Sequence, residues 1–217
     1  DVVVMEAYHW RYHPYVGQMR AVLDSGVLGP LVRVAAAFDI PTSEIPRDDI
    51  RWDLAIGGGS TMDLGCYPIQ WVRWAVGADP EVVSAVADEP VPGIDATLTA
   101  ELRWPSGVTG TITSTMEHPG SETSIWLEVV GEHGTMRATN PLAPQYGGAT
   151  ITVESPDGTQ TIEADGSSTY YHQLVAFRDA IVSGTPFPTT ADDGVRTMEI
   201  IDACYVAAGL GPRPAFG

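Results

Sequence analysis

The sequence predicts an α+β fold in which helices pack on one face of a broad, mainly antiparallel β-sheet. Residues 80–162 form a long succession of alternating, β-branched segments, and Gly- and Pro-containing turn sequences separate one segment from the next. Helix-like segments precede and follow this region and are nearly absent within it. Strands joined by such short connections must pair largely antiparallel, because a parallel pair needs a crossover of about a dozen residues or more.

The first part of the chain is predicted to alternate between strands and helices. The predicted elements, in order, are a strand at 1–6, a helix at 11–25 closed by Gly26, a strand at 31–40, a loop at 41–56 and a helix at 60–76 closed by Gly77. The apolar run at the start has neither an initiator Met nor the basic region of a secretory signal. We therefore expect the chain to be part of a longer protein.

The central and C-terminal parts supply most of the predicted sheet and two further helices. Strands are predicted at 81–88, 95–104, 107–116, 124–131, 134–140, 149–155 and 159–164, and helices at 169–184 and 191–208. The turn sequences Pro105-Ser106-Gly107, Gly131-Glu132-His133-Gly134 and Pro156-Asp157-Gly158 predict hairpins. We interpret residues 1–217 as a single domain.

Composition and charge exclude several classes of function. A net charge of -17 repels a phosphate backbone, so nucleic acid is not an expected partner. No stretch approaches the ~20 apolar residues of a membrane span, so no membrane association is expected. All 11 basic residues are arginine, so any mechanism that requires an amine must find it outside this sequence. The five histidines show no metal-ligand spacing with cysteines or acids, and no metal is expected.

The two cysteines favour a cytoplasmic location. Cys66 and Cys204 both lie in predicted helices among apolar neighbours. This setting is typical of reduced packing residues rather than of a disulfide.

The stretch GGGSTMDLGCYPI, residues 57–69, is the most informative motif of the chain. A dinucleotide fingerprint needs G-x-G-x-x-G between a strand and a helix, whereas this glycine run follows a loop and has a different spacing. One interpretation is structural: Ser60 caps the helix, and Asp63 completes a capping box. Asp63 and Tyr67 are also four residues apart on one helical face, which favours a functional pair. Three consecutive glycines further suggest that another backbone or a ligand approaches closely.

Four segments together resemble the substrate domain of the glucose-fructose oxidoreductase / inositol dehydrogenase (Gfo/Idh/MocA) family. They are GGGSTMDLGCYPI at 57–69, EAYHWRYHP at 6–14, RWDLAIGGG at 51–59 and the closing YYHQLVAFRDAIVSG…IIDACYVAAGL. In that family a Gly-Gly-Gly run precedes Asp-x3-His or Asp-x3-Tyr on a helix. Tyr67 and the EAYHWRYHP segment place the chain near the dihydrodiol and xylose dehydrogenase branch.

The resemblance implies a second domain and a role for the Asp63–Tyr67 pair. In the family, an N-terminal Rossmann domain binds NAD or NADP and ends near a Glu-Lys-Pro motif. Its lysine would lower the pKa of Tyr67, because a neighbouring ammonium favours phenolate. Tyr67 would then exchange the proton of the substrate hydroxyl, and Asp63 would orient the substrate or the lysine. For Tyr67, an aromatic at the edge of the core remains the alternative.

Further site residues follow from the same resemblance. His9 would line the substrate pocket, although a packed or solvated histidine on this connection is equally compatible with the sequence. Tyr170 and Tyr171 are candidates for the pocket wall. Arg51, with its neighbour Trp52, would contact the cofactor, because guanidinium binds phosphate well.

The sequence therefore predicts the substrate-binding and oligomerisation domain of an NAD(P)-dependent oxidoreductase that acts on a sugar or a cyclic diol. The alternative is a stand-alone domain that serves as a non-redox binding or assembly module, or as a non-redox enzyme. A sheet with helices on one side leaves its other face for water or for another subunit. We expect a homodimer that forms through this face.

Overall fold

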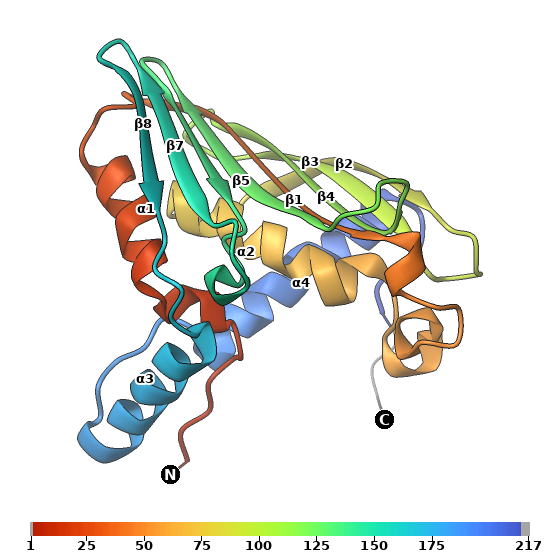
Figure 1. The fold of residues 1–217 in the computed structure, drawn as a ribbon. Helices are drawn as coiled ribbons and strands as arrows, with labels where there is room; N and C mark the ends of the chain where they lie inside the picture. The colour runs from red at the N-terminus through yellow and green to blue at the C-terminus, as the bar shows by residue number, and fades with distance from the viewer. Residues whose placement is uncertain (1, 214–217) are drawn as a thin grey trace. The chain divides into compact units, whose positions relative to one another are not determined.

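The fold was analysed in a computed structural model, which describes residues 2–213 (Figure 1). The chain divides into two compact units. The first unit comprises the segment up to Leu31 together with Glu128–Arg196, and the second comprises Val32–Leu127 together with the segment from Thr197 onward.

Eight strands form one open sheet in the order β2-β3-β4-β1-β5-β6-β7-β8. The strands are β1 (Leu31–Pro41), β2 (Glu81–Asp88), β3 (Thr97–Arg103), β4 (Thr109–His118), β5 (Ser124–Gly131), β6 (Thr135–Thr139), β7 (Thr150–Ser155) and β8 (Gly158–Glu163). The pairs β2/β3, β3/β4, β6/β7 and β7/β8 are antiparallel, and β1 pairs with β4 in parallel. The predicted fold class is confirmed, as a mixed sheet with mostly antiparallel pairs.

Helices and short helical turns connect and cover the strands. The helices are α1 (Pro14–Asp24), α2 (Cys66–Val76), α3 (Thr169–Ser183) and α4 (Ala191–Ala207). The turns are η1 (His9–Tyr12), η2 (Thr42–Glu44), η3 (Ile50–Trp52), η4 (Leu54–Ile56), η6 (Pro144–Tyr146) and the π-helical η5 (Thr61–Gly65). Within residues 2–213, no helix combines the length and the apolar character that crossing a membrane requires.

In the second unit the sheet has one buried face and one partly open face. Along β3, Leu98, Ala100 and Leu102 are almost fully buried, whereas the residues between them are partly exposed. Helix α2 and turn η5 both pack against β4, and α2 contributes buried Ile69 and Val72. Burying each such aliphatic side chain stabilises the fold by about 1.5–3 kcal/mol. These contacts place the helix that carries Tyr67 firmly on the sheet.

In the first unit, His13 begins helix α1. Its Nδ1 accepts a hydrogen bond from the backbone N–H of Tyr15 at 3.1 Å, and Pro14 occupies the first helical position. Because Nδ1 is an acceptor, the neutral ring carries its hydrogen on Nε2, which donates to the carbonyl oxygen of Ser167 at 3.0 Å. His13 thus links the start of α1 to the segment before α3.

The predicted strand at residues 1–6 is wrong. Residues 2–8 belong to no helix or strand, and Val2 and Val4 are exposed. The backbone N–H of Glu6 donates to the carbonyl oxygen of Thr189 at 2.8 Å, and the Glu6 carbonyl accepts from Thr189 Oγ1 at 2.8 Å. The hydrogen-bonding groups of this segment therefore bind a loop instead of a neighbouring strand.

Candidate functional site

Each glycine of the run 57–59 has its own structural reason. Gly57 has φ of 81° and ends η4 in a left-handed conformation. A Cβ on Gly58 would lie 2.6 Å from the carbonyl oxygen of Arg51. A Cβ on Gly59, whose φ is 128°, would lie 2.2 Å from Asp95 Oδ1. The predicted close approach is therefore made by the chain's own backbone and by a buried carboxylate, which leaves no open phosphate cradle at this run.

Asp95 anchors the start of the helix that carries Asp63 and Tyr67. Its side chain is fully buried, and its Oδ2 accepts from Ser60 Oγ at 2.8 Å, Thr61 N at 2.8 Å and Thr61 Oγ1 at 2.6 Å. A carboxylate that accepts a backbone N–H at a helix N-terminus also interacts favourably with the helix dipole. Asp95 thus caps this helix from a distant part of the sequence.

The other oxygen of Asp95 ties the same corner to the C-terminal segment. Oδ1 accepts from Tyr205 Oη at 3.0 Å and from Arg213 Nη2 at 2.8 Å. Arg213 is itself nearly buried, so the pair is a buried ion pair whose remaining lone pairs are used by hydroxyl and amide donors. This network fixes the helix start. No local pattern predicts the role of Asp95, because its partners lie 34 to 118 residues away in the sequence.

The predicted capping box at Ser60 and Asp63 is wrong. Ser60 has helical dihedrals, makes no side-chain cap bond and donates to Asp95 instead. The Asp63 carboxylate turns to Arg51, whose Nε donates to Oδ2 at 2.5 Å, while Arg51 Nη1 donates to Asp49 Oδ1 at 3.0 Å. The physical reason is that Asp95 already binds the first free backbone amide of the helix, so Asp63 is available for another partner.

Tyr67 lies one turn further along, where η5 passes into α2. The backbone from Thr61 to Gly65 is π-helical, a rare geometry that occurs frequently at functional sites. The Tyr67 ring is partly exposed and packs edge-on against Phe38, with ring centroids 5.9 Å apart, and near Trp71 at 6.2 Å. Its ring is supported by the core without being enclosed by it.

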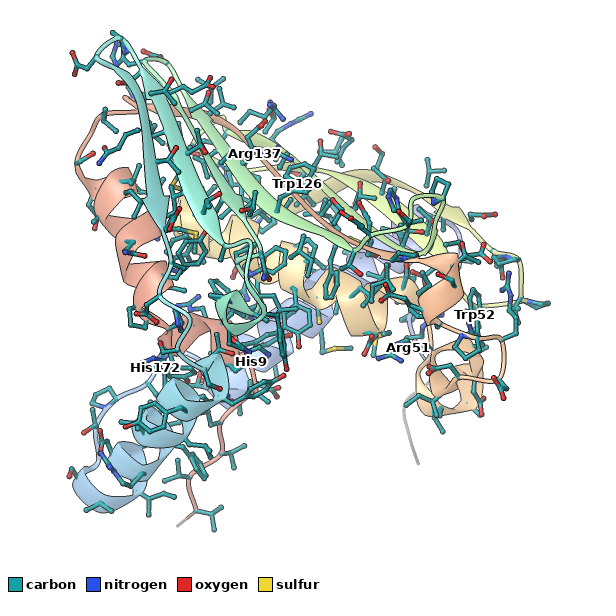
Figure 2. The ribbon with its side chains drawn as sticks, in the orientation of Figure 1. His9, Arg51, Trp52, Trp126, Arg137 and His172 are labelled. Carbon is teal, nitrogen blue, oxygen red and sulfur yellow. The ribbon has the colours of Figure 1, made fainter. Side chains whose placement is uncertain are left out.

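The loop between β1 and η5 places Arg51 and Trp52 next to each other in sequence and in space (Figure 2). Trp52 is buried, the guanidinium of Arg47 lies 3.9 Å from its ring centroid, and its Nε1 has no hydrogen-bond partner among the described residues. The Arg51 guanidinium contacts two carboxylates. The predicted cofactor role of Arg51 and Trp52 stays a prediction.

The other predicted site residues belong to the first unit. His9 lies beside the first turn of α3 (Figure 2), is 5% exposed and bonds through Nδ1 to Thr169 Oγ1 at 2.8 Å. Burial lowers the pKa of His9 to about 4, so the ring is neutral at physiological pH. The Tyr170 ring lies over it with centroids 4.2 Å apart, and both Tyr170 and Tyr171 are exposed.

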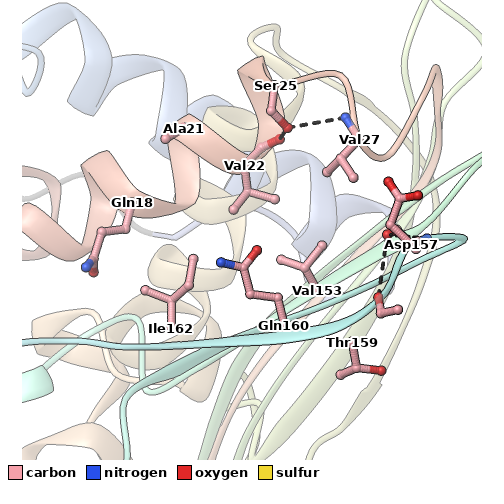
Figure 3. A pocket seen from close by; sticks show the side chains of 12 residues that line it. Gln18, Ala21, Val22, Ser25, Val27, Val153, Asp157, Thr159, Gln160 and Ile162 are labelled. Carbon is pink, nitrogen blue, oxygen red and sulfur yellow. Dashed lines mark hydrogen bonds between the residues drawn. The ribbon is translucent and has the colours of Figure 1, made fainter.

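The structure therefore brings two sets of predicted residues together. Arg51 contacts Asp63 in the second unit, and His9 contacts Tyr170 in the first. A pocket of about 520 Å³ also lies in the first unit, between α1 and the β7–β8 hairpin (Figure 3). Residues such as Val22, Val153 and Ile162 line it, and none of the predicted site residues does.

The fold defines the class of the chain: an open mixed sheet covered by helices, of the kind that forms the C-terminal domain of Gfo/Idh/MocA proteins. The profile of the GFO/IDH/MocA C-terminal domain matches residues 16–137, more than half of the chain. The chain belongs to the GFO/IDH/MocA family.

Relatives include dehydrogenases and reductases. The chain is 28% identical over 211 residues to D-xylose 1-dehydrogenase (NADP(+)) 2 of Haloferax volcanii, which covers 97% of this chain and 63% of the relative. It is 34% identical over 139 residues to the trans-1,2-dihydrobenzene-1,2-diol dehydrogenase of Sus scrofa, covering 64% of this chain and 40% of the relative.

A solved structure agrees with the fold over nearly the whole chain. KijD10, a 3-ketoreductase from Actinomadura kijaniata in complex with NADP and TDP-benzene, superposes with a TM-score of 0.83 at 28% identity. The match covers 95% of this chain and 62% of KijD10. The chain thus spans about three fifths of the length of these full-length relatives.

Proposed function

We propose that the chain is the substrate-binding and dimerisation part of an NAD(P)-dependent oxidoreductase that acts at a hydroxyl carbon of a sugar or cyclic diol. The observation that carries the proposal is the partly exposed Asp63–Tyr67 pair on one helix, whose start Asp95 anchors. Family membership and relatives named as a D-xylose dehydrogenase and a dihydrodiol dehydrogenase support the substrate class.

In this proposal Tyr67 exchanges the proton of the substrate hydroxyl. The packing of its ring against Phe38 sets the direction of the phenol. The hydroxyl is therefore already oriented when the substrate binds, which lowers the entropic cost of the reaction. An unperturbed phenol, with a pKa near ~10, is a weak base at neutral pH, and an ammonium nearby would favour phenolate. Because this chain contains no lysine, that ammonium must come from another part of the protein.

Asp63 would orient the substrate or that ammonium, and Arg51 would act as a positioning residue. The bond from Arg51 Nε to Asp63 fixes one carboxylate oxygen, and the second contact to Asp49 fixes Arg51 in turn. A guanidinium occupied by two carboxylates fits this role better than direct binding of a cofactor phosphate.

The nicotinamide cofactor, NAD or NADP, would be held mainly by a Rossmann domain upstream of this chain. The glycine run is filled by the chain's own atoms, so the described residues do not fit a nucleotide phosphate there. When bound, the cofactor would accept or supply the hydride at the hydroxyl carbon. His9, Tyr170 and Tyr171 would contact the substrate, with neutral His9 and the tyrosine hydroxyls acting as hydrogen-bonding groups.

The decisive experiment is Tyr67→Phe in the intact protein. Turnover of D-xylose or of trans-1,2-dihydrobenzene-1,2-diol with NADP⁺ should fall about 10²-fold or more, the usual scale for losing a general acid-base group. Thermal unfolding should change little, because the ring and its contacts remain. Tyr146→Phe, at an exposed position on η6, is the control and should keep full activity.

Full activity of Tyr67→Phe would remove the catalytic assignment. A second measurement separates the domains: residues 1–217 alone should not bind NADPH, because the glycine run is closed and the net charge of -17 repels the pyrophosphate. Micromolar binding of NADPH in a fluorescence titration would contradict the proposal that a separate domain binds the cofactor.

We further propose a homodimer in the cytoplasm. On the partly open face of the second unit, threonines from neighbouring strands pair through their hydroxyls, Thr97 with Thr115 at 2.5 Å and Thr99 with Thr113 at 3.1 Å. A face lined by such short side chains can pack against a second sheet. Cys66 and Cys204 form no disulfide with each other, which supports a reducing compartment.

A further inference from the structure

Helix α3 exposes apolar side chains along most of its length. Of its fifteen residues, all of them described, only Thr169 and Ala180 are buried. The exposed large apolar side chains, between 50 and 77% accessible, are Tyr170, Tyr171, Leu174, Ile181 and Val182. Large apolar side chains that cluster on an exposed surface commonly mark a site of interaction with other protein. Among the described residues, α3 packs against η1, and these five apolar side chains stay exposed.

The exposed apolar side chains gather on one side of the helix, where the exposed side chain of Arg178 lies among them. Tyr170, Leu174 and Ile181 are separated by four and seven residues, so they fall on one side of the helix. Tyr171 and Val182 lie on the flank of this group. We call these five residues the α3 face. Aromatic and aliphatic side chains gathered in this way are typical of the buried centre of an interface.

The N-terminal segment leads into turn η1, and this turn packs against α3. Gln173 Nε2, on this helix, donates to the carbonyl oxygen of Glu6 at 3.2 Å, and Thr189 holds the same carbonyl from the loop that follows the helix. A domain joined upstream of Val2 would therefore be tethered next to α3. Such a tether raises the effective concentration of the domain at this surface to about millimolar.

We propose that the α3 face is the docking surface of the nucleotide-binding domain upstream. This inference rests on the proposed function, which requires such a domain. Several relatives are longer than this chain, which covers 61 to 63% of their length. The α3 face also begins at Tyr170, whose ring lies on His9, so a domain docked there would border the proposed substrate residues.

The test uses the intact protein with the double substitution Leu174→Glu and Ile181→Glu. Two carboxylates inside an apolar contact should uncouple the domains, since burying unpaired charge is strongly unfavourable. Calorimetry should show one unfolding transition for the wild type and two for the variant. Proteolysis upstream of Val2 should become at least tenfold faster, and turnover should fall at least tenfold with an unchanged Kd for NADPH.

The control is Val206→Glu, which places one such carboxylate at a similarly exposed apolar position on α4, 61% accessible. It should retain the single transition and the wild-type turnover. Unchanged coupling and turnover in the double variant would overturn the docking surface while leaving the proposed function intact. A change of oligomer mass without domain uncoupling would also overturn it, in favour of a contact between two copies. Failure of the intact wild type to bind NADPH would instead remove the proposed function itself.

Discussion

Asp39 carries a carboxylate that folding removes from water without a full set of partners. It lies on β1, and its Oδ1 is buried and has no hydrogen-bond partner among the described residues. Burial raises the pKa of Asp39 from 3.8 to about 6, and His118 partly opposes this rise. Above pH 6 the Asp39 carboxylate is therefore charged in the folded protein, where it is less well solvated than in the unfolded chain.

The sign of the resulting pH dependence follows directly. Between pH 3.8 and about 6 the folded state binds the proton more tightly, so this residue's contribution to stability falls as the pH rises through that window. The shift corresponds to ~3 kcal/mol, which partial exposure reduces to about 1 kcal/mol. Asp39→Asn should raise the free energy of unfolding by that amount at pH 7.5 and leave it nearly unchanged at pH 3.5. Urea titrations at fixed protein concentration test this, and equal effects at both pH values would contradict it.

His13 should give the opposite dependence. Burial lowers its pKa, with Asp165 opposing, so protonation is easier in the unfolded chain. Its Nδ1 accepts the Tyr15 amide, and a proton on that nitrogen would end the cap of α1. The contribution of His13 is complete above pH ~6.5 and is lost as the pH falls below it.

His13→Asn tests this cap, because asparagine can also accept the amide but does not titrate. The decline in unfolding free energy between pH 7.5 and 5.5 should become shallower in urea titrations of the variant. His133→Asn, in the exposed β5–β6 turn, serves as the control and should follow the wild-type profile. A variant profile parallel to that of the wild type would show that His13 does not titrate in this window.

At the scale of elements, Gly59 holds the entry to the helix of Asp63 and Tyr67. Its φ of 128° is unfavourable for any other residue, and a Cβ would lie 2.2 Å from Asp95 Oδ1. Gly59→Ala should therefore destabilise the fold by about 3 kcal/mol or more, from backbone strain plus displacement of a buried carboxylate. Gly77→Ala tests backbone strain alone, because φ is 80° there and no atom lies within 4 Å of the added Cβ. It should cost about 1 kcal/mol. Similar losses in thermal unfolding for both variants would show that the contact with Asp95 is unimportant.

Sequence patterns predicted most elements because their signals are local. Alternation and turn residues placed β2 at 81–88 and β5 at 124–131 with the observed ends. The strand predicted at 1–6 failed because an apolar run does not reveal its hydrogen-bond partners, which here are Thr189 and Gln173. The parallel pairing of β1 with β4 was not predictable from local patterns either, since it joins residues that lie 76 positions apart, such as Ala37 and Thr113.

The candidate site was predictable in part for the same reason. Asp63 and Tyr67 were proposed from their spacing on one helix, which is a local pattern, and their role stays a prediction. The contact of Asp63 with Arg51 and the anchoring role of Asp95 depend on how loops fold back, and no local pattern encodes them. The glycine run signalled a close approach correctly, but only the fold shows that Asp95 and the Arg51 carbonyl make it.

At the scale of the whole molecule, the negative net charge opposes the proposed dimerisation. A net charge of -17 per chain makes two copies repel, whereas threonine hydroxyls line much of the sheet face proposed for the dimer. Repulsion between surface charges is screened over ~10 Å at 0.1 M salt and over shorter distances above it. Dimerisation should therefore tighten as salt increases, because the attractive contact is not ionic.

Sedimentation equilibrium between 20 mM and 500 mM NaCl tests this balance. The dimer Kd should fall by about tenfold, equivalent to ~1.4 kcal/mol, over that range. Thr99→Glu with Thr113→Glu should give a monomer even at 500 mM NaCl, because the two carboxylates would lie opposite each other in the centre of the contact. Gln160→Glu adds charge in the first unit, where Gln160 lines the pocket between α1 and β8, and should leave the dimer intact. A wild-type monomer at tens of micromolar in 500 mM NaCl would rule out the sheet-face dimer, and a Kd that rises with salt would show that ion pairs hold the two copies together instead.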